Sequence, residues 1–155
     1  IIGELEQYYE VVVVTQNVDN LHERAGSSHV IHLHGELTKV CSENGKKCVE
    51  EIGYRDLRYG EKAADGHFLR PFIVWFGEDV PLLSRAAKEI ESADILIIIG
   101  TSLNVYPAAS LIYSAPVHCS IYLVDPNEVQ PVARQVEFIK EPATVGMRIL
   151  KDKLT

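Results

Sequence analysis

The chain has 155 residues, of which 46% are hydrophobic, and this is enough to bury the core of one domain. Its net charge of −7 argues against general binding to nucleic-acid phosphates, and no apolar run approaches the roughly 20 residues of a membrane-spanning helix, so neither partner is expected. Three cysteines, an odd number, do not suggest a disulfide framework and favour a reducing, cytoplasmic location.

Four short runs rich in β-branched residues are predicted as parallel strands, because uninterrupted apolar runs suit strands that are covered on both faces. They are residues 11–14, 72–76, 95–99 and 121–124. The chain starts at Ile1 without a methionine and in a helical pattern, so we expect an upstream portion to precede it.

Helical patterns lie between these runs. One covers residues 80–94, where Leu83, Ala86, Ala87 and Ile90 share a face at three- and four-residue spacing. A second helix is predicted to start near Tyr106 or Pro107, and a third covers residues 144–154. This alternation of strands and helices predicts an α/β fold with a doubly wound parallel sheet.

Residues 39–69 interrupt the alternation, because they are polar, rich in glycine and charge, and only weakly periodic. We predict a small inserted lobe here, within a single domain that covers residues 1–155. Packing of Ile52, Tyr54, Leu57 and Tyr59 is expected to hold the lobe together.

Small or hydrogen-bonding residues follow the predicted strands. The segments are "TQNVD", "HG", "GE", "GTSLN" and "DPNE", which come after "VVVV", "VIHL", "IVWF", "ILIII" and "IYLV". Each segment alone reads as a turn. Ligands collect at the carboxyl ends of the strands of open parallel sheets, so the segments together favour a binding site. The sequence contains no GxGxxG fingerprint.

Four motifs in series carry a family resemblance. "TQNVDNLHERAG", "HLHG", "RPFIVWFGE" and "GTSLNVYPAA", in this order, closely resemble the sirtuins, which are NAD-dependent protein-lysine deacylases. The match runs from about Val11 to the C-terminus and implies a Rossmann-like fold. It leaves out the family's first strand and the Gly-rich, Arg-containing loop that closes over NAD.

The resemblance implies that His34 of "HLHG" is the catalytic base. In the family, the acyl oxygen of the modified lysine attacks the ribose carbon that bears nicotinamide, and the histidine takes a proton from a ribose hydroxyl. The products are nicotinamide and an O-acyl-ADP-ribose. The acyl group that is removed from lysine is acetyl or a longer or acidic group. An imidazole suits this role because it can be neutral and accepting at cellular pH. By geometry the chief rival is His32, which alternates with His34 across Leu33.

The resemblance also implies the residues that bind the two substrates. NAD is expected to meet Gln16, Asn17, Asp19, Gly100, Thr101, Ser102, Asp125, Asn127 and Ala143. The acylated lysine, in a peptide or protein, is expected to lie between two segments that contribute Val74, Phe76, Gly77, Glu78, Asn104 and Val105. The side chains after residue 15 can equally cap a helix that starts near Val18. Asp125 departs from the family, where many members carry Asn.

A structural zinc, common in sirtuins, is not expected here. The family uses two closely spaced cysteine pairs, whereas residues 39–69 contain only Cys41 and Cys48. His67 offers a third group at most, and Cys119 reads as a buried small hydrophobic residue. We therefore expect a lobe without a complete zinc site.

Two other functions stay open. The chain could be a module that binds NAD or ADP-ribose without catalysis, or the complete protein could transfer ADP-ribose to proteins from the same site. Without the upstream loop, the 155-residue chain alone is expected to be inactive. It is also expected to expose unpaired strand edges that favour self-association.

Overall fold

A computed structural model describes residues 1–101, 106–127 and 135–155. The chain forms two compact units, which we call the terminal unit (Ile1–Val12 with Leu82–Thr155) and the central unit (Val13–Pro81). In the described residues the strands form three sheets, one in the terminal unit and two in the central unit.

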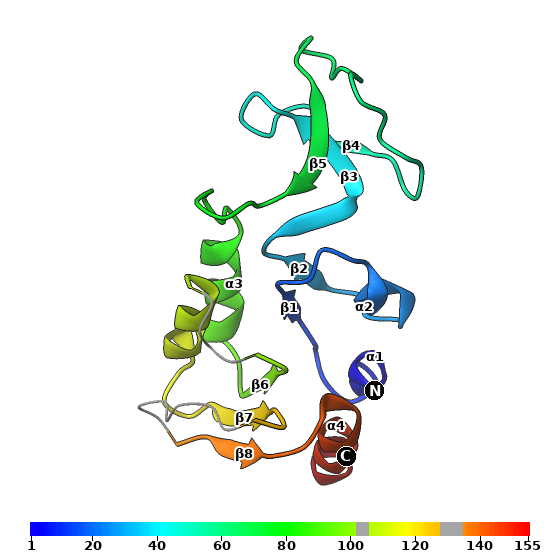
Figure 1. Cartoon of the computed structure of the whole chain (residues 1–155). Coiled ribbons are helices and arrows are strands. Elements are labelled where there is room, and N and C mark those ends of the chain that lie inside the picture. The colour runs from blue at the N-terminus through cyan, green and yellow to red at the C-terminus, as the bar shows by residue number, and fades with distance from the viewer. Residues whose placement is uncertain (102–105, 128–134) are drawn as a thin grey trace. The chain divides into compact units, whose positions relative to one another are not determined.

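The terminal unit contains a parallel sheet in the order β6 (Ile95–Ile99), β7 (Ser120–Val124) and β8 (Glu137–Ile139) (Figure 1). The predicted strands at residues 95–99 and 121–124 are confirmed, the first with the same bounds. Ile99 is in register with Val124, so the carboxyl ends of β6 and β7 lie next to each other.

The predicted helices of the terminal unit are present. Helix α3 (Leu83–Glu91) buries Ala86 and Ile90 from the predicted face and contacts η1 (Ala108–Ser114), a 3₁₀ helix that follows Pro107 (Figure 1). Helix α4 spans Ala143–Leu154. In the described part of the chain, no helix is long and apolar enough to cross a bilayer.

Helix α4 packs closely against the sheet and against α1 (Ile2–Leu5). Leu5, Val124, Met147 and Leu150 form a buried cluster in the terminal unit. Gly146 allows the close approach, because a Cβ there would lie 2.4 Å from Cγ1 of Val124. An ion pair between Glu4 and Lys151 links the two helices at the surface.

The central unit begins with β1 (Val13–Thr15), the short helix α2 (Leu21–Arg24) and β2 (Val30–His32). Strands β1 and β2 are parallel, with Thr15 in register with His32. This pairing brings the carboxyl ends of both strands together, so "TQNVD" and "HG" start side by side.

An antiparallel sheet completes the central unit, with β3 (Gly35–Ser42) between β4 (Glu50–Glu51) and β5 (Leu69–Ile73). The prediction of a parallel strand at residues 72–76 is therefore wrong in direction and bounds. An apolar run indicates burial but does not specify the direction of its partner. Here β5 returns alongside β3 and ends at Ile73.

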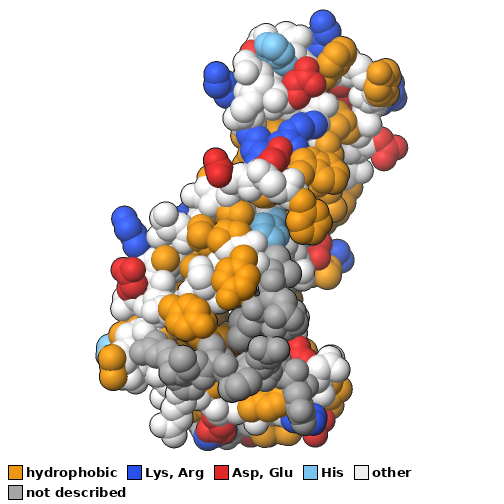
Figure 2. All heavy atoms as spheres, turned by 60° about the vertical axis from the view of Figure 1, so that its left-hand side comes forward, with side chains coloured by type: hydrophobic (Ala, Val, Ile, Leu, Met, Phe, Trp, Pro, Cys, Tyr) orange, Lys and Arg blue, Asp and Glu red, His pale blue; other side chains and the backbone are white. Residues whose placement is uncertain are grey.

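Polar contacts, more than aromatic packing, organise residues 43–68. Tyr54 and Tyr59 are 78% and 108% exposed, so their predicted role in packing this segment is wrong. Glu61 instead pairs with Arg55 at 2.9 Å and accepts a hydrogen bond from the backbone N–H of Arg58 at 2.7 Å. Hydrophobic side chains that reach the surface are also visible in Figure 2.

Candidate active site

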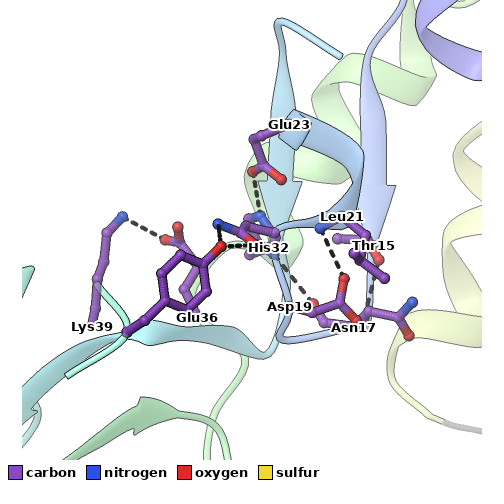
Figure 3. Close-up of polar contacts among 10 residues, drawn as sticks. Thr15, Asn17, Asp19, Leu21, Glu23, His32, Glu36 and Lys39 are labelled. Atoms are coloured by element: carbon purple, nitrogen blue, oxygen red, sulfur yellow. Dashed lines mark hydrogen bonds and ion pairs between the residues drawn. The ribbon is translucent and has the colours of Figure 1, made fainter. Parts of the chain in front are cut away.

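The segment after β1 is fixed mainly by backbone contacts within the central unit. Leu33 N–H donates to the carbonyl of Thr15 at 2.9 Å, and Leu37 N–H donates to that of Val18 at 2.8 Å. The Asp19 carboxylate accepts from Leu21 N–H at 3.0 Å, at the start of α2 (Figure 3). Helix α2 starts three residues after Val18, and its N-cap residue, Asn20, makes no side-chain capping bond; Asp19 instead accepts from the N–H of the first helical residue.

The two amide side chains of the segment are at least partly accessible to solvent. Gln16 is half-buried and Asn17 is exposed, while Asn17 N–H donates to Oγ1 of Thr15 at 3.1 Å. This bond holds the backbone at the strand end and leaves the Asn17 amide directed outward. Such amides can bind ribose hydroxyls or a carboxamide, as predicted for NAD.

His34 follows β2 and is half-buried, with its ring fixed at one nitrogen. Nδ1 lies 3.2 Å from the carbonyl oxygen of Gln16. Because a carbonyl only accepts, Nδ1 carries the hydrogen, and the neutral ring presents Nε2 as an unprotonated acceptor. Within the described residues no hydrogen bond to Nε2 is found. This arrangement is what a general base requires.

His32, the rival by geometry, is 6% exposed and has both ring nitrogens engaged. Nδ1 lies 3.2 Å from the carbonyl of Asn17, and Nε2 lies 2.7 Å from Oε1 of Glu23 (Figure 3). Burial acts to raise the pKa of the Glu23 carboxyl. The hydrogen bond from His32, together with a backbone hydrogen bond and nearby charges, outweighs the effect of burial, so the pKa is lowered. His32 is therefore not free to act as the base.

The segment that is predicted to bind the substrate peptide is hydrogen-bonded to the backbone of His34, because Val74 N–H donates to the carbonyl of His34 at 2.9 Å. The chain then turns through Gly77, and the Phe76 side chain is fully exposed. The structure thus brings the predicted base and the start of the predicted peptide-binding segment together.

Glu78 closes this turn. Its carboxylate contacts Lys46 Nζ at 2.8 Å, Arg70 Nη2 at 2.8 Å and Trp75 N–H at 3.0 Å. The hydrogen bond from Lys46, followed by that from Trp75, lowers the pKa of Glu78 from 4.5 to about 2. Glu78 therefore anchors the turn in addition to the substrate contact predicted for it.

Acid should weaken this anchor. A carboxylate whose pKa is lowered by folding contributes stability that is complete above its ordinary value of 4.5 and is lost as the pH falls toward about 2. In thermal melts from pH 7 to pH 2, we expect Glu78→Gln to be less stable than the wild type at neutral pH, with the difference shrinking below pH 4.5. Glu91→Gln, which alters an exposed carboxylate of α3, is the control. A difference that stays constant across this range would contradict the role of Glu78.

Other predicted NAD contacts lie at one edge of the terminal unit's sheet. Gly100 and Asp125 directly follow the adjacent strands β6 and β7. Oδ1 of Asp125 accepts from Asn127 N–H at 2.8 Å and from its side-chain amide at 3.2 Å. Thr101 follows Gly100, and Ala143 is the exposed first residue of α4. Ser102, Asn104 and Val105 lie outside the described residues.

The cysteines of the central unit do not fit a structural zinc site. Cys41 is fully buried and its thiol lies 3.9 Å from the carbonyl of Pro71, and burial raises its pKa and so disfavours the thiolate that binds zinc. Among the described residues, one group of three His, Cys, Asp or Glu side chains brings its potential metal-ligand atoms close together. This group contains no cysteine. Ser42 is also fully buried, and it donates to Asp65 Oδ2 at 2.8 Å across the lobe.

Metal removal should leave the protein unaffected. We expect no stoichiometric zinc by elemental analysis, and an unchanged melting temperature with a chelator. Ser42→Ala should instead lower the free energy of unfolding, because the fully buried Ser42 hydroxyl donates to Asp65 and accepts from the backbone N–H of Asn44, and both bonds are lost. The exposed Ser84→Ala serves as the matched control. One zinc per chain, with a chelator-sensitive melting temperature, would contradict the expectation that the chain holds no structural zinc.

Two contacts were missed by sequence reasoning, namely Glu23 with His32 and Ser42 with Asp65. Their members are 9 and 23 residues apart, respectively. Once β1 and β2 are paired, the position of His32 opposite Thr15 places it beside the polar loop, and this register is the signal that could have identified the first contact.

The parallel sheet of the terminal unit, with helices and polar residues at its strand ends, is typical of the Rossmann-like α/β class. The chain matches the model of the Sir2 family over residues 1–107. It belongs to this family, the sirtuins.

Several relatives are similar over nearly the whole chain. An NAD-dependent protein deacylase of Bacteroides thetaiotaomicron is 49% identical over 160 residues, covering 99% of this chain and 68% of the relative. One from Helicobacter pylori (strain ATCC 700392 / 26695) is 49% identical over 154 residues, covering 99% and 67%. The chain thus spans about two thirds of the length of these relatives.

Solved structures agree on the fold. A Sir2 homologue mutant in complex with ADP-ribose has a TM-score of 0.83 at 37% identity, covering 99% of this chain and 65% of that chain. A Sir2 homologue in complex with NAD has a TM-score of 0.82 at 36% identity, covering 99% and 63%. The predicted Rossmann-like α/β class is confirmed by these similarities.

Proposed function

We propose that the protein carrying this chain is an NAD-dependent protein-lysine deacylase in which His34 is the general base. The observation that carries the proposal is the contact between Nδ1 of His34 and the Gln16 carbonyl, which leaves Nε2 as the acceptor. In this role Nε2 takes a proton from a ribose hydroxyl of NAD, which is consumed as a co-substrate. Relatives at 49% identity with the name NAD-dependent protein deacylase support the assignment.

Gln16, Asn17 and Asp19 are proposed to bind the nicotinamide ribose. The half-buried and exposed amides of Gln16 and Asn17 follow the same strand end, beside the anchor of His34. Asp19, whose Oδ1 receives Leu21 N–H, retains a second oxygen for a ribose hydroxyl. In the terminal unit, Gly100, Thr101, Asp125, Asn127 and the start of α4 at Ala143 are proposed to meet the rest of the dinucleotide.

The acylated lysine is proposed to approach along residues 74–78. The backbone of this segment is tied to His34 at Val74, and its turn is fixed by Glu78, while Phe76 projects its ring into solvent. A main-chain mode of binding would accept many peptide sequences. A Sir2 complex with a p53 peptide and NAD⁺, which is 26% identical to this chain with a TM-score of 0.73, supports a peptide substrate.

Nicotinamide release tests the function. The protein is incubated with NAD and either an acetyl-lysine peptide or the same peptide unmodified, and both nicotinamide and the peptide mass are followed. We expect release only with the acetylated peptide, with one peptide deacylated per nicotinamide. NAD binding without turnover would instead indicate a binding module. ADP-ribose attached to protein would indicate a transferase.

A further inference from the structure

His32 lies between a carboxylate and a backbone carbonyl, both of which only accept hydrogen bonds. Its Nε2 lies 2.7 Å from Glu23 of α2, and its Nδ1 lies 3.2 Å from the carbonyl of Asn17. Only the doubly protonated ring can donate to both partners. The ring is 6% exposed, so water contributes little to its solvation and the two protein contacts define its orientation.

The two histidines of "HLHG" hold consecutive carbonyls of the same loop. His32 contacts the carbonyl of Asn17, and His34 contacts that of Gln16, each through Nδ1 at 3.2 Å. Leu33 between them is 2% exposed and donates its N–H to the carbonyl of Thr15. Because Gln16 and Asn17 are neighbours in the chain, a shift of the Asn17 carbonyl would also move the Gln16 carbonyl, which orients His34.

The charges around His32 come from two elements of the central unit, α2 and β3. Glu23 lies on α2, and Glu36 on β3 brings a carboxylate oxygen within 4.8 Å of the His32 and Glu23 atoms (Figure 3). Lys39 pairs with Glu36 at 2.6 Å, so the second carboxylate has its own cation. His22 also acts on Glu23 through its charge. Glu23 is thus the acid paired directly with His32.

We propose that His32 is a positioning residue, whose contact with the Asn17 carbonyl fixes the loop on which His34 is oriented, while Glu23 of α2 orients the His32 ring. This proposal rests on the proposed function of His34. His32 does not touch the reacting atoms in this role. It sets the direction of the His34 ring and of the neighbouring amides that are proposed to bind NAD.

Substitutions that keep one contact at a time test the proposal in the full-length protein. An Asn amide reaches about as far as Nδ1 and can donate to Asn17, whereas a Gln amide reaches about as far as Nε2 and can donate to Glu23. His32→Asn, His32→Gln and His32→Ala are compared with the wild type by steady-state kinetics with NAD and an acetyl-lysine peptide. His118→Ala, which removes an exposed histidine 3.6 Å from Asp94, is the matched control.

We expect His32→Ala to lower kcat by about tenfold or more and to raise KM for NAD, with KM for the peptide unchanged, because small misplacements of reacting groups are costly. His32→Asn should recover most of this loss, and His32→Gln should not. A merely structural role would lower the amount of folded protein and hence the apparent kcat, with both KM values unchanged.

The proposal is overturned if KM for NAD stays at the wild-type value in all three variants, or if Gln rescues better than Asn. Thermal melts of each variant show whether the measured protein is folded, and a His32→Ala variant that does not fold leaves the Asn and Gln pair to decide. His34→Ala in the same assay separates the two levels. An active His34→Ala would overturn the proposed function itself, whereas an inactive His34→Ala with unaffected His32 variants would overturn only the positioning role.

Discussion

Replacing His34 by Ala should lower turnover by about 10²- to 10⁴-fold, the usual contribution of a general base. The structural reason is that Nε2 is the acceptor left by the contact of Nδ1 with Gln16. The His34 ring is only half-buried, so the variant should melt close to the wild type. Peptide-dependent nicotinamide release from NAD is the measurement.

His118→Ala is the control for this experiment, because it removes an exposed imidazole of the terminal unit. It should retain wild-type turnover. Full activity in a folded His34→Ala variant would show that another group takes the ribose proton.

Replacing Gly35 by Ala should lower the free energy of unfolding of the central unit more than a substitution at an exposed position does. Gly35 has φ of 81°, and a Cβ there would lie 2.1 Å from the carbonyl oxygen of Phe72 on the paired strand β5. Since a backbone atom cannot move aside as a side chain can, we expect a loss of about 3 kcal/mol or more in unfolding free energy. Urea unfolding measures it, and activity should fall as well because Gly35 adjoins His34.

Gly66→Ala is a closely matched control. Gly66 has φ of 83° but nothing within 4 Å of an added Cβ, so only the cost of the left-handed backbone remains, about 1–2 kcal/mol. Equal losses in the two variants would show that the contact with Phe72 is unimportant.

The buried parallel strands of the terminal unit could be predicted from sequence because their apolar runs are continuous. The run at residues 95–99 coincides with β6, and Ile121–Val124 falls within β7. Helices α3 and α4 also follow their apolar periodicity. These features are local, so a short stretch of sequence contains the information that specifies them.

Features that depend on distant partners could not be predicted in the same way. The direction of β5 is set by its pairing with β3, and the exposure of Tyr54 and Tyr59 depends on how residues 43–68 are arranged. At the site, the motif identified His34 but did not separate it from His32 by chemistry. In the described residues that distinction comes from the hydrogen-bond partners of each ring, which are a carbonyl for His34 and a carbonyl together with Glu23 for His32.

The destination of the acyl group gives the most direct test of NAD-dependent deacylation. The protein is mixed with NAD and an acetyl-lysine peptide, and the reaction is quenched early. The products are then separated, identified by mass spectrometry and quantified. Deacylation through the ribose should place the acetyl group on ADP-ribose as an ester, in amounts equal to the nicotinamide released. Free acetate formed at the same rate without NAD, or peptide deacylated with no acetyl-ADP-ribose at the earliest times, would contradict the proposed reaction.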